Sequence, residues 1–153
     1  MKRVLAIDPG ERRWGLAVSD PTGRIALPLE VYERVGWRED VAYLRAVIAR
    51  YGAGELVVGR PLTARGGAGV QAGRAARLAA RLREALRLPV TEVDERFSTA
   101  AAERTLRAGG VKSRQRRARR DAIAAALILQ PYLDRRGAAA PLQGQGEGVM
   151  LAP

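Results

Sequence analysis

The chain has 153 residues, a hydrophobic fraction of 47% and a formal net charge of +11, which together suit one compact, basic domain. It contains neither cysteine nor histidine, so disulfides, thiolate or imidazole metal sites and a histidine general base are excluded. A compact domain this basic repels itself unless a polyanion is its partner, and nucleic acid is the natural candidate. The alternative is a basic protein whose charge merely prevents aggregation.

The N-terminal part of the chain predicts three strands. The apolar run from Arg3 to Ile7 ends at an acid and is typical of a buried strand. Residues 14–18 and 25–31 predict two more, and Pro28 indicates an edge strand or a bulge. Because short connections join all three, an antiparallel meander is expected.

The middle of the chain alternates between helical and strand patterns. Residues 38–51 carry apolar side chains at helical spacing, and Gly52 and Gly54 are expected to end that helix. Residues 56–59 predict a fourth strand, apolar throughout as in a strand covered on both faces. After a glycine-containing loop at 60–69, residues 70–86 predict a long Arg/Ala/Leu helix.

The remaining elements complete a β-β-β-α-β-α-β-α-α order. Residues 89–93 predict a fifth strand, and a helix capped by Ser98 or Thr99 follows. A basic stretch leads into a last helix over residues 121–134. We therefore expect one domain over residues 1–136 and a flexible tail over 137–153, which is rich in Gly, Ala, Pro and Gln.

The chain shows no signal for a membrane or for secretion. No stretch approaches the ~20 apolar residues of a membrane span. The first apolar run is too short for a signal peptide. We expect a cytoplasmic protein without membrane partners, either a monomer or a homodimer.

Three acids stand at places where a site can form. Asp8 ends the first strand, and Pro9-Gly10 after it lets a phosphate approach the backbone closely. Glu95 follows the fifth strand, and strand alternation allows only one of Asp94 and Glu95 to face a given site. Asp121 opens the last helix on its apolar face, so its side chain is expected to point toward the sheet.

Each acid also has a purely structural interpretation. An Asp after a strand is a common turn former, a Glu at a strand end forms local ion pairs, and an Asp in a first helical turn is favoured by the helix dipole. Taken together, three oxygen ligands without His or Cys suit a hard cation, Mg²⁺ or Mn²⁺. Such ions activate water and stabilise the leaving oxygen of a phosphodiester.

Basic residues near these acids are candidate nucleic-acid contacts. Arg13 and Arg96 are placed to orient a scissile phosphate. Arg60 and the glycine-rich loop after it are candidates for backbone contacts, with a mobile loop as the alternative. A basic run beside Asp121 is a candidate surface for nucleic acid, with a solvated face as the alternative; its members are Lys112, Arg114, Arg116, Arg117, Arg119 and Arg120. Trp14, Trp37 and Phe97 are expected to pack in the core or at its rim.

Four segments in this order resemble the bacterial YqgF/RuvX family, whose members are described as Holliday junction resolvases and as pre-16S rRNA nucleases. They are residues 6–10 (Ala-Ile-Asp-Pro-Gly) with Arg13 and 15–17, residues 57–62 (Val-Val-Gly-Arg-Pro-Leu), residues 94–99 (Asp-Glu-Arg-Phe-Ser-Thr), and residues 121–130 with Tyr132. The resemblance covers roughly residues 4–133.

The resemblance implies an α/β ribonuclease H-like fold, with a five-stranded mixed sheet of order 3-2-1-4-5 and helices on both sides. It also implies a metal-dependent nuclease with Asp8, Glu95 and Asp121 as catalytic and metal-binding residues. Junction resolvases of this fold carry an acid at the end of the fourth strand, where this chain has Gly59-Arg60-Pro61. The second acid must therefore come from Glu95.

The predicted function is an endonuclease-type hydrolase acting on pre-16S rRNA near its 5′ end or on branched DNA, with ribosomal RNA slightly favoured. The alternative is a non-catalytic nucleic-acid-binding factor in transcription or ribosome assembly, which needs the basic surface but not the acids. An actin-like phosphotransferase also begins with an acid-ending strand, but needs two such domains, and this chain is too short for them.

Overall fold

The computed structural model of the chain describes residues 2–60, 70–94 and 120–137. Several sequence predictions lie outside these residues: most of the loop over 60–69, the roles of Glu95, Arg96 and Phe97, the helix and basic stretch between Ser98 and Arg119, and the tail beyond residue 137. Within the described part, no helix is both long and apolar enough to cross a membrane.

A mixed five-stranded sheet forms the centre of the fold, in the order β3-β2-β1-β4-β5. The first three strands form an antiparallel meander, while β4 and β5 run parallel to β1. This confirms both the meander and the predicted strand order. The strands are β1 (Arg3–Pro9), β2 (Arg13–Ser19), β3 (Ala26–Glu33), β4 (Ala53–Arg60) and β5 (Val90–Asp94).

Strand β3 lies at one edge of the sheet, as its proline predicted. Pro28 lies in β3, which among the described strands pairs with β2 alone, so the amide that proline lacks is not needed for a second ladder. Pro28 lies opposite Ala17, where the β2–β3 register shifts by one residue. The sequence predicted an edge strand or a bulge at this proline, and the structure shows an edge strand with a register shift there.

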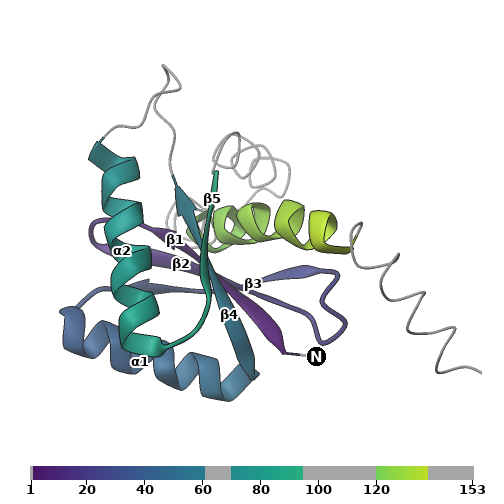
Figure 1. The fold of residues 1–153 in the computed structure, drawn as a ribbon, viewed down its shortest axis with the longest axis horizontal. Coiled ribbons are helices and arrows are strands. Elements are labelled where there is room, and N and C mark those ends of the chain that lie inside the picture. The colour runs from purple at the N-terminus through teal and green to yellow at the C-terminus, as the bar shows by residue number, and fades with distance from the viewer. Residues whose placement is uncertain (1, 61–69, 95–119, 138–153) are drawn as a thin grey trace, which may run out of the picture.

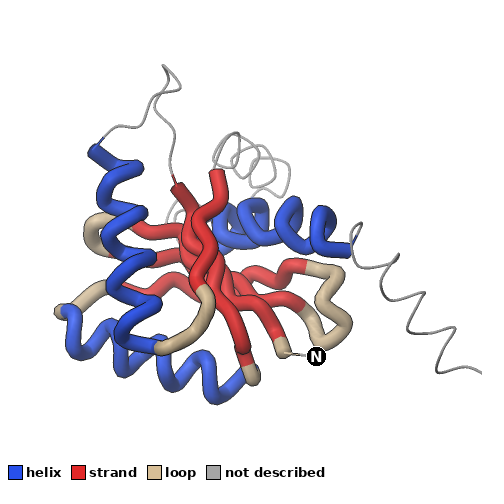
Figure 2. The backbone as a smooth tube through the Cα atoms, viewed as in Figure 1, coloured by secondary structure: helices blue, strands red, loops and turns tan. Residues whose placement is uncertain are grey.

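Helices cover both faces of the sheet (Figures 1 and 2). Helices α1 (Trp37–Tyr51) and α2 (Val70–Leu86) lie on one face, and a C-terminal helix over residues 120–137 lies on the other. Gly52 ends α1 in the left-handed conformation, with φ of 68°, and donates its amide to the Ile48 carbonyl. Gly54, expected to help end this helix, lies instead within β4, because Gly52 alone reverses the chain direction.

Alternation along β1 divides its side chains between two cores. Leu5 and Ile7 belong to the core under α1 and α2, whereas Val4 and Ala6 belong to the core under the C-terminal helix. Two residues after Ala6, Asp8 therefore lies on the face that the C-terminal helix covers.

A buried acid fixes the entry to α1. The Asp40 side chain is fully buried and accepts hydrogen bonds from the Tyr32 hydroxyl (2.8 Å), the Arg34 Nε–H (3.1 Å) and the Val35 amide (3.0 Å). Burial by itself raises the pKa of Asp40, but these hydrogen bonds outweigh it and hold the pKa below its usual 3.8. The charged carboxylate thus ties the end of β3 to the first turns of α1.

We expect Asp40→Ala to destabilise the fold by about 3 kcal/mol, because it leaves two part-buried hydrogen-bond donors and the Arg34 charge without their acceptor. The free energy of unfolding in urea measures this loss. The neighbouring first-turn acid offers a matched control, since Glu39 is exposed and Glu39→Ala is expected to change stability by less than about 0.5 kcal/mol. Equal losses in the two variants would contradict the anchoring role.

The same carboxylate predicts a pH dependence of stability. Since its folded pKa is lowered, the contribution of Asp40 is fully present above about pH 4 and is lost as the pH falls through the folded pKa. The difference in unfolding free energy between wild type and Asp40→Ala should therefore shrink on acidification below that range. A difference that stayed constant down to acid unfolding would contradict a charged Asp40.

Candidate active site

The candidate site begins at the carboxyl end of β1. Asp8 is half-buried there and lies opposite Gly15 in the antiparallel register with β2. In the turn that follows, a side chain on residue 10 would stand 2.5 Å from the Arg13 carbonyl oxygen. Gly10 is therefore required by the turn itself, in addition to any close approach of a phosphate.

The C-terminal helix reaches this point through a contact between backbones. A β-carbon on Gly15 would lie 2.0 Å from the carbonyl oxygen of Asp121 and 3.1 Å from its Cβ. The absence of a side chain at residue 15 therefore lets the first turn of the helix rest directly on β2, at the residue paired with Asp8. Two acids separated by more than one hundred residues thus come to one place.

Contacts farther along the same helix fix its position on the sheet. The Gln130 side chain accepts a hydrogen bond from the Ala26 amide (2.9 Å) and donates one to the Arg24 carbonyl (2.8 Å). The Tyr132 hydroxyl donates to Glu55 of β4 (2.7 Å). Because these bonds attach the helix to both halves of the sheet, Asp121 is held by the whole helix rather than by its first turn alone.

Asp8 and Asp121 line one hollow of about 200 Å³, together with the residues of the β1–β2 turn. The other lining residues are Pro9, Gly10, Glu11, Arg12 and Arg13. The Arg13 Nε lies 3.9 Å from an Asp121 carboxylate oxygen, and both side chains remain partly exposed. The structure therefore brings Asp8, Asp121 and Arg13 together at this hollow.

The electrostatics of Asp121 favour a cation at this hollow. Burial raises the pKa of Asp121 because the charged form loses water, and the nearby charges of Arg13 and Arg120 only partly offset this effect. Arg120, one of the predicted nucleic-acid contacts, thus lies close enough to act on Asp121. A carboxylate held in this way gains stability from a further positive charge.

Arg60 lies on the other face of the sheet. Arg60 comes two residues after Val58 in the same strand, and Val58 belongs to the core under α1 and α2, so both side chains lie on that face. The Arg60 guanidinium forms an ion pair of 2.8 Å with Asp94. The structure therefore does not bring Arg60 to the Asp8 hollow, and its contact with nucleic acid stays a prediction. Asp94 is likewise placed on the face away from Asp8.

The third predicted acid, Glu95, lies outside the described residues, as do Arg96 and most of the basic run: Lys112, Arg114, Arg116, Arg117 and Arg119. In the part of the chain that the structure describes, no group of three side chains able to hold a metal ion is found. Of the three acids of the predicted centre, the structure describes two, Asp8 and Asp121.

Sequence reasoning did not give Gly15 a role. The signal was present, since a glycine inside a strand often marks the close approach of another backbone. The sequence also contained no sign that Glu11 lies at this hollow. This acid lines the hollow but forms an ion pair with Arg74 of α2, so its charge is already balanced.

Comparisons with known proteins agree on one family. The RuvX family model, described as Holliday junction resolvase, matches residues 2–135. A protein of Syntrophus aciditrophicus (strain SB) is 41% identical over 86% of this chain and 88% of its own length. One of Roseiflexus sp. (strain RS-1) is 43% identical over 86% and 94%. Both bear the name "Putative pre-16S rRNA nuclease".

A solved structure is similar in fold. The RuvC protein of T. thermophilus, determined in complex with a Holliday junction substrate, superposes with a TM-score of 0.52 over 90% of this chain and 97% of its own. Sequence identity is 21%. Together with the strand order, this confirms the ribonuclease H-like fold.

Proposed function

This chain belongs to the RuvX family and is a nuclease, and we propose that it hydrolyses phosphodiester bonds at the hollow formed by Asp8 and Asp121. One observation carries the proposal. The C-terminal helix sets its first acid against the residue paired with Asp8, beside an arginine and in a basic protein.

The donor chemistry of the hollow fits a divalent metal ion. Its acids are oxygen donors, and the chain has no histidine or cysteine to favour a softer metal. The raised pKa of Asp121 is consistent with a carboxylate placed to receive a cation. We propose Asp8, Asp121 and Glu95 as the ligands of Mg²⁺ or Mn²⁺, and Glu95 is the remaining choice at the end of β5 because Asp94 pairs with Arg60.

When bound, such an ion activates a water molecule and stabilises the charge that develops on the leaving oxygen. The residues of the chain supply binding and orientation. Asp8, fixed by the sheet, and Asp121, fixed by the docked helix, hold their carboxylates at one hollow. Arg13, at the same hollow, is placed to bind a non-bridging oxygen of the scissile phosphate. The Gly10 turn leaves room for the nucleic-acid backbone beside these groups.

We propose pre-16S rRNA as the substrate, processed near its 5′ end. The names of relatives with more than 40% identity support this choice. Branched DNA is the second candidate, supported by the description of the family model. At the end of β4 this chain has glycine and arginine in place of an acid, so its acidic centre differs from that of junction resolvases of the same fold.

A cleavage assay separates the two substrates. Wild-type protein with Mg²⁺ or Mn²⁺ is given a pre-16S rRNA leader fragment, an unrelated single-stranded RNA, single-stranded DNA and a four-way DNA junction. We expect defined cleavage of the leader fragment and none by Asp121→Asn. Preferential cutting of the junction would support the second candidate. If the wild type bound these nucleic acids but cut none of them, the protein would be a non-catalytic binding factor.

A further inference from the structure

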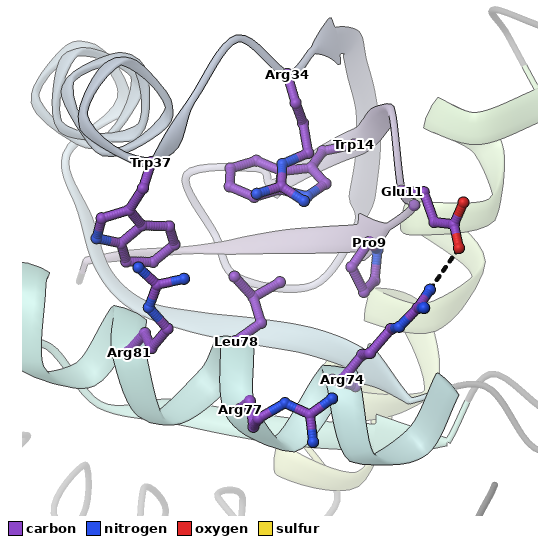
Figure 3. A pocket seen from close by; sticks show the side chains of 11 residues that line it. Pro9, Glu11, Trp14, Arg34, Trp37, Arg74, Arg77, Leu78 and Arg81 are labelled. Atoms are coloured by element: carbon purple, nitrogen blue, oxygen red, sulfur yellow. Dashed lines mark hydrogen bonds and ion pairs between the residues drawn. The ribbon is translucent and has the colours of Figure 1, made fainter. Parts of the chain in front are cut away.

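A second cavity lies on the face of the sheet opposite the Asp8 hollow. Its volume is about 430 Å³, within the range of sites that bind small ligands or single nucleotides. Helix α2 forms one wall, and β1, β2 and the start of α1 form the rest (Figure 3). The cavity shares Pro9, Gly10 and Glu11 with the Asp8 hollow, so the two adjoin at the β1–β2 turn.

Arginines surround this cavity in excess over acids. Arg34 is paired with Asp40, and Arg74 with Glu11. Arg77 and Arg81, both exposed, also line it, and neither forms an ion pair with any described carboxylate. Because Arg74, Arg77 and Arg81 follow one another at helical spacing, a single face of α2 presents them together. Among the described residues, these two positive charges at the cavity have no acidic partner.

The inner surface of the cavity is aromatic and apolar. Trp14 is fully buried, as expected of a core residue, yet its indole N–H has no acceptor among the described residues. Trp37 is half-buried, and the Arg81 guanidinium lies 3.8 Å from the centre of its ring (Figure 3). A guanidinium stacked on an aromatic ring keeps its in-plane N–H groups available for a phosphate. Leu78 adds apolar surface between them.

We propose that this cavity binds a nucleotide of the substrate strand next to the cleavage point, with its phosphate on Arg77 and Arg81 and its base and sugar against Trp37 and Leu78. Cationic edges beside an aromatic surface are the combination that binds single-stranded nucleic acid without regard to sequence. The inference rests on the proposed function in one respect, since it takes the strand to be the one that is cut at Asp8.

The connection between the two cavities favours a continuous strand over a separate small ligand. A strand whose phosphate lies beside Asp8 and Arg13 would cross Pro9, Gly10 and Glu11, which line both cavities, to reach the arginines of α2. Its backbone then follows positive charge on both sides of the turn. The assignment thus explains why the basic face of α2 is directed at the β1–β2 turn.

Intrinsic fluorescence tests this assignment. The chain has two tryptophans, and both line the cavity. A short single-stranded RNA of mixed sequence, added in EDTA to prevent cleavage, is expected to quench the tryptophan emission at saturation. The Arg77→Ala/Arg81→Ala variant should bind about tenfold more weakly. The slope of log affinity against log salt should fall by about 0.7, for the one phosphate that the two arginines bind.

The matched control is Arg24→Ala/Arg50→Ala, which removes the same charge. Arg50 also lies near an aromatic ring, 5.5 Å from the centre of Tyr51, and neither control residue lines the cavity. We expect near wild-type binding and quenching from it. Arg77→Lys/Arg81→Lys is expected to recover part of the affinity, which a misfolded variant would not. Equal losses in the two alanine pairs, or binding without quenching, would overturn the proposal.

Three further outcomes bear on the two proposals. A mononucleotide that bound as tightly as the RNA would show a nucleotide pocket rather than a strand path, and would also overturn the proposal. The fluorescence experiment needs no cleavage. A wild type that never cuts would therefore count against the proposed function, while the fluorescence and affinity measurements would still decide whether the cavity binds the strand. Conversely, cleavage with unchanged fluorescence would refute only the strand path.

Discussion

Asp8→Asn is expected to abolish metal-dependent cleavage while leaving nucleic-acid binding intact. The substitution keeps the size of the side chain and its place in the sheet but removes the negative charge that binds a divalent ion. We expect the cleavage rate to fall by about three orders of magnitude, equivalent to about 4 kcal/mol in activation free energy. Single-turnover cleavage of the pre-16S rRNA leader at saturating protein measures this loss without interference from binding.

The control for this variant is a charge change at an acid outside the hollow. Asp94→Asn removes a carboxylate of the same type, placed on the opposite face and paired with Arg60. It should retain cleavage within a few-fold of wild type. Affinity for the same RNA, measured in EDTA, should be unchanged or slightly higher in both variants because each gains positive charge. Full cleavage by Asp8→Asn would exclude the Asp8 hollow as the catalytic centre.

Gly15→Ala is expected to reduce cleavage about a hundredfold although it adds only one methyl group and touches no charged atom. The new β-carbon would lie 2.0 Å from the Asp121 carbonyl oxygen, so either the C-terminal helix or β2 must move. A displacement of about 1 Å at a catalytic group is enough for a loss of this size. Since both segments are backbone within a packed layer, stability should also fall, by about 1–3 kcal/mol.

Cleavage and unfolding measured on the same preparation separate the two effects. Gly36→Ala is the matched control, because its β-carbon would meet only the end of the flexible Glu39 side chain, and both activity and stability should remain near wild type. A metal titration adds a specific readout, since a shifted Asp121 should raise the Mg²⁺ concentration required for cleavage. If Gly15→Ala cut at the wild-type rate with unchanged metal dependence, the position of Asp121 would not matter for catalysis.

Local pattern was sufficient for most of the elements. Helix α2 has the bounds that the sequence predicted, and the strands differ from prediction by a few residues at their ends. Apolar periodicity and turn residues are local properties, so they can be read without knowledge of the fold. Glu95 and the basic run near Asp121 stay predictions from sequence, since the described residues do not include Glu95 or most of that run.

The sequence by itself determined the order of the elements and the excess of positive charge. It also placed Asp8 at the end of a strand and Asp121 at the start of a helix whose apolar face packs on the sheet. Only the tertiary structure decided which charges share a face. Register does this: because Ile7 lies beside Val58 across β1 and β4, Arg60 lies on the face opposite Asp8 and pairs with Asp94. The docking of Asp121 against Gly15 joins segments far apart in the chain. A glycine inside a strand signals that another backbone approaches, but which segment approaches depends on packing between layers, which local residue patterns do not encode.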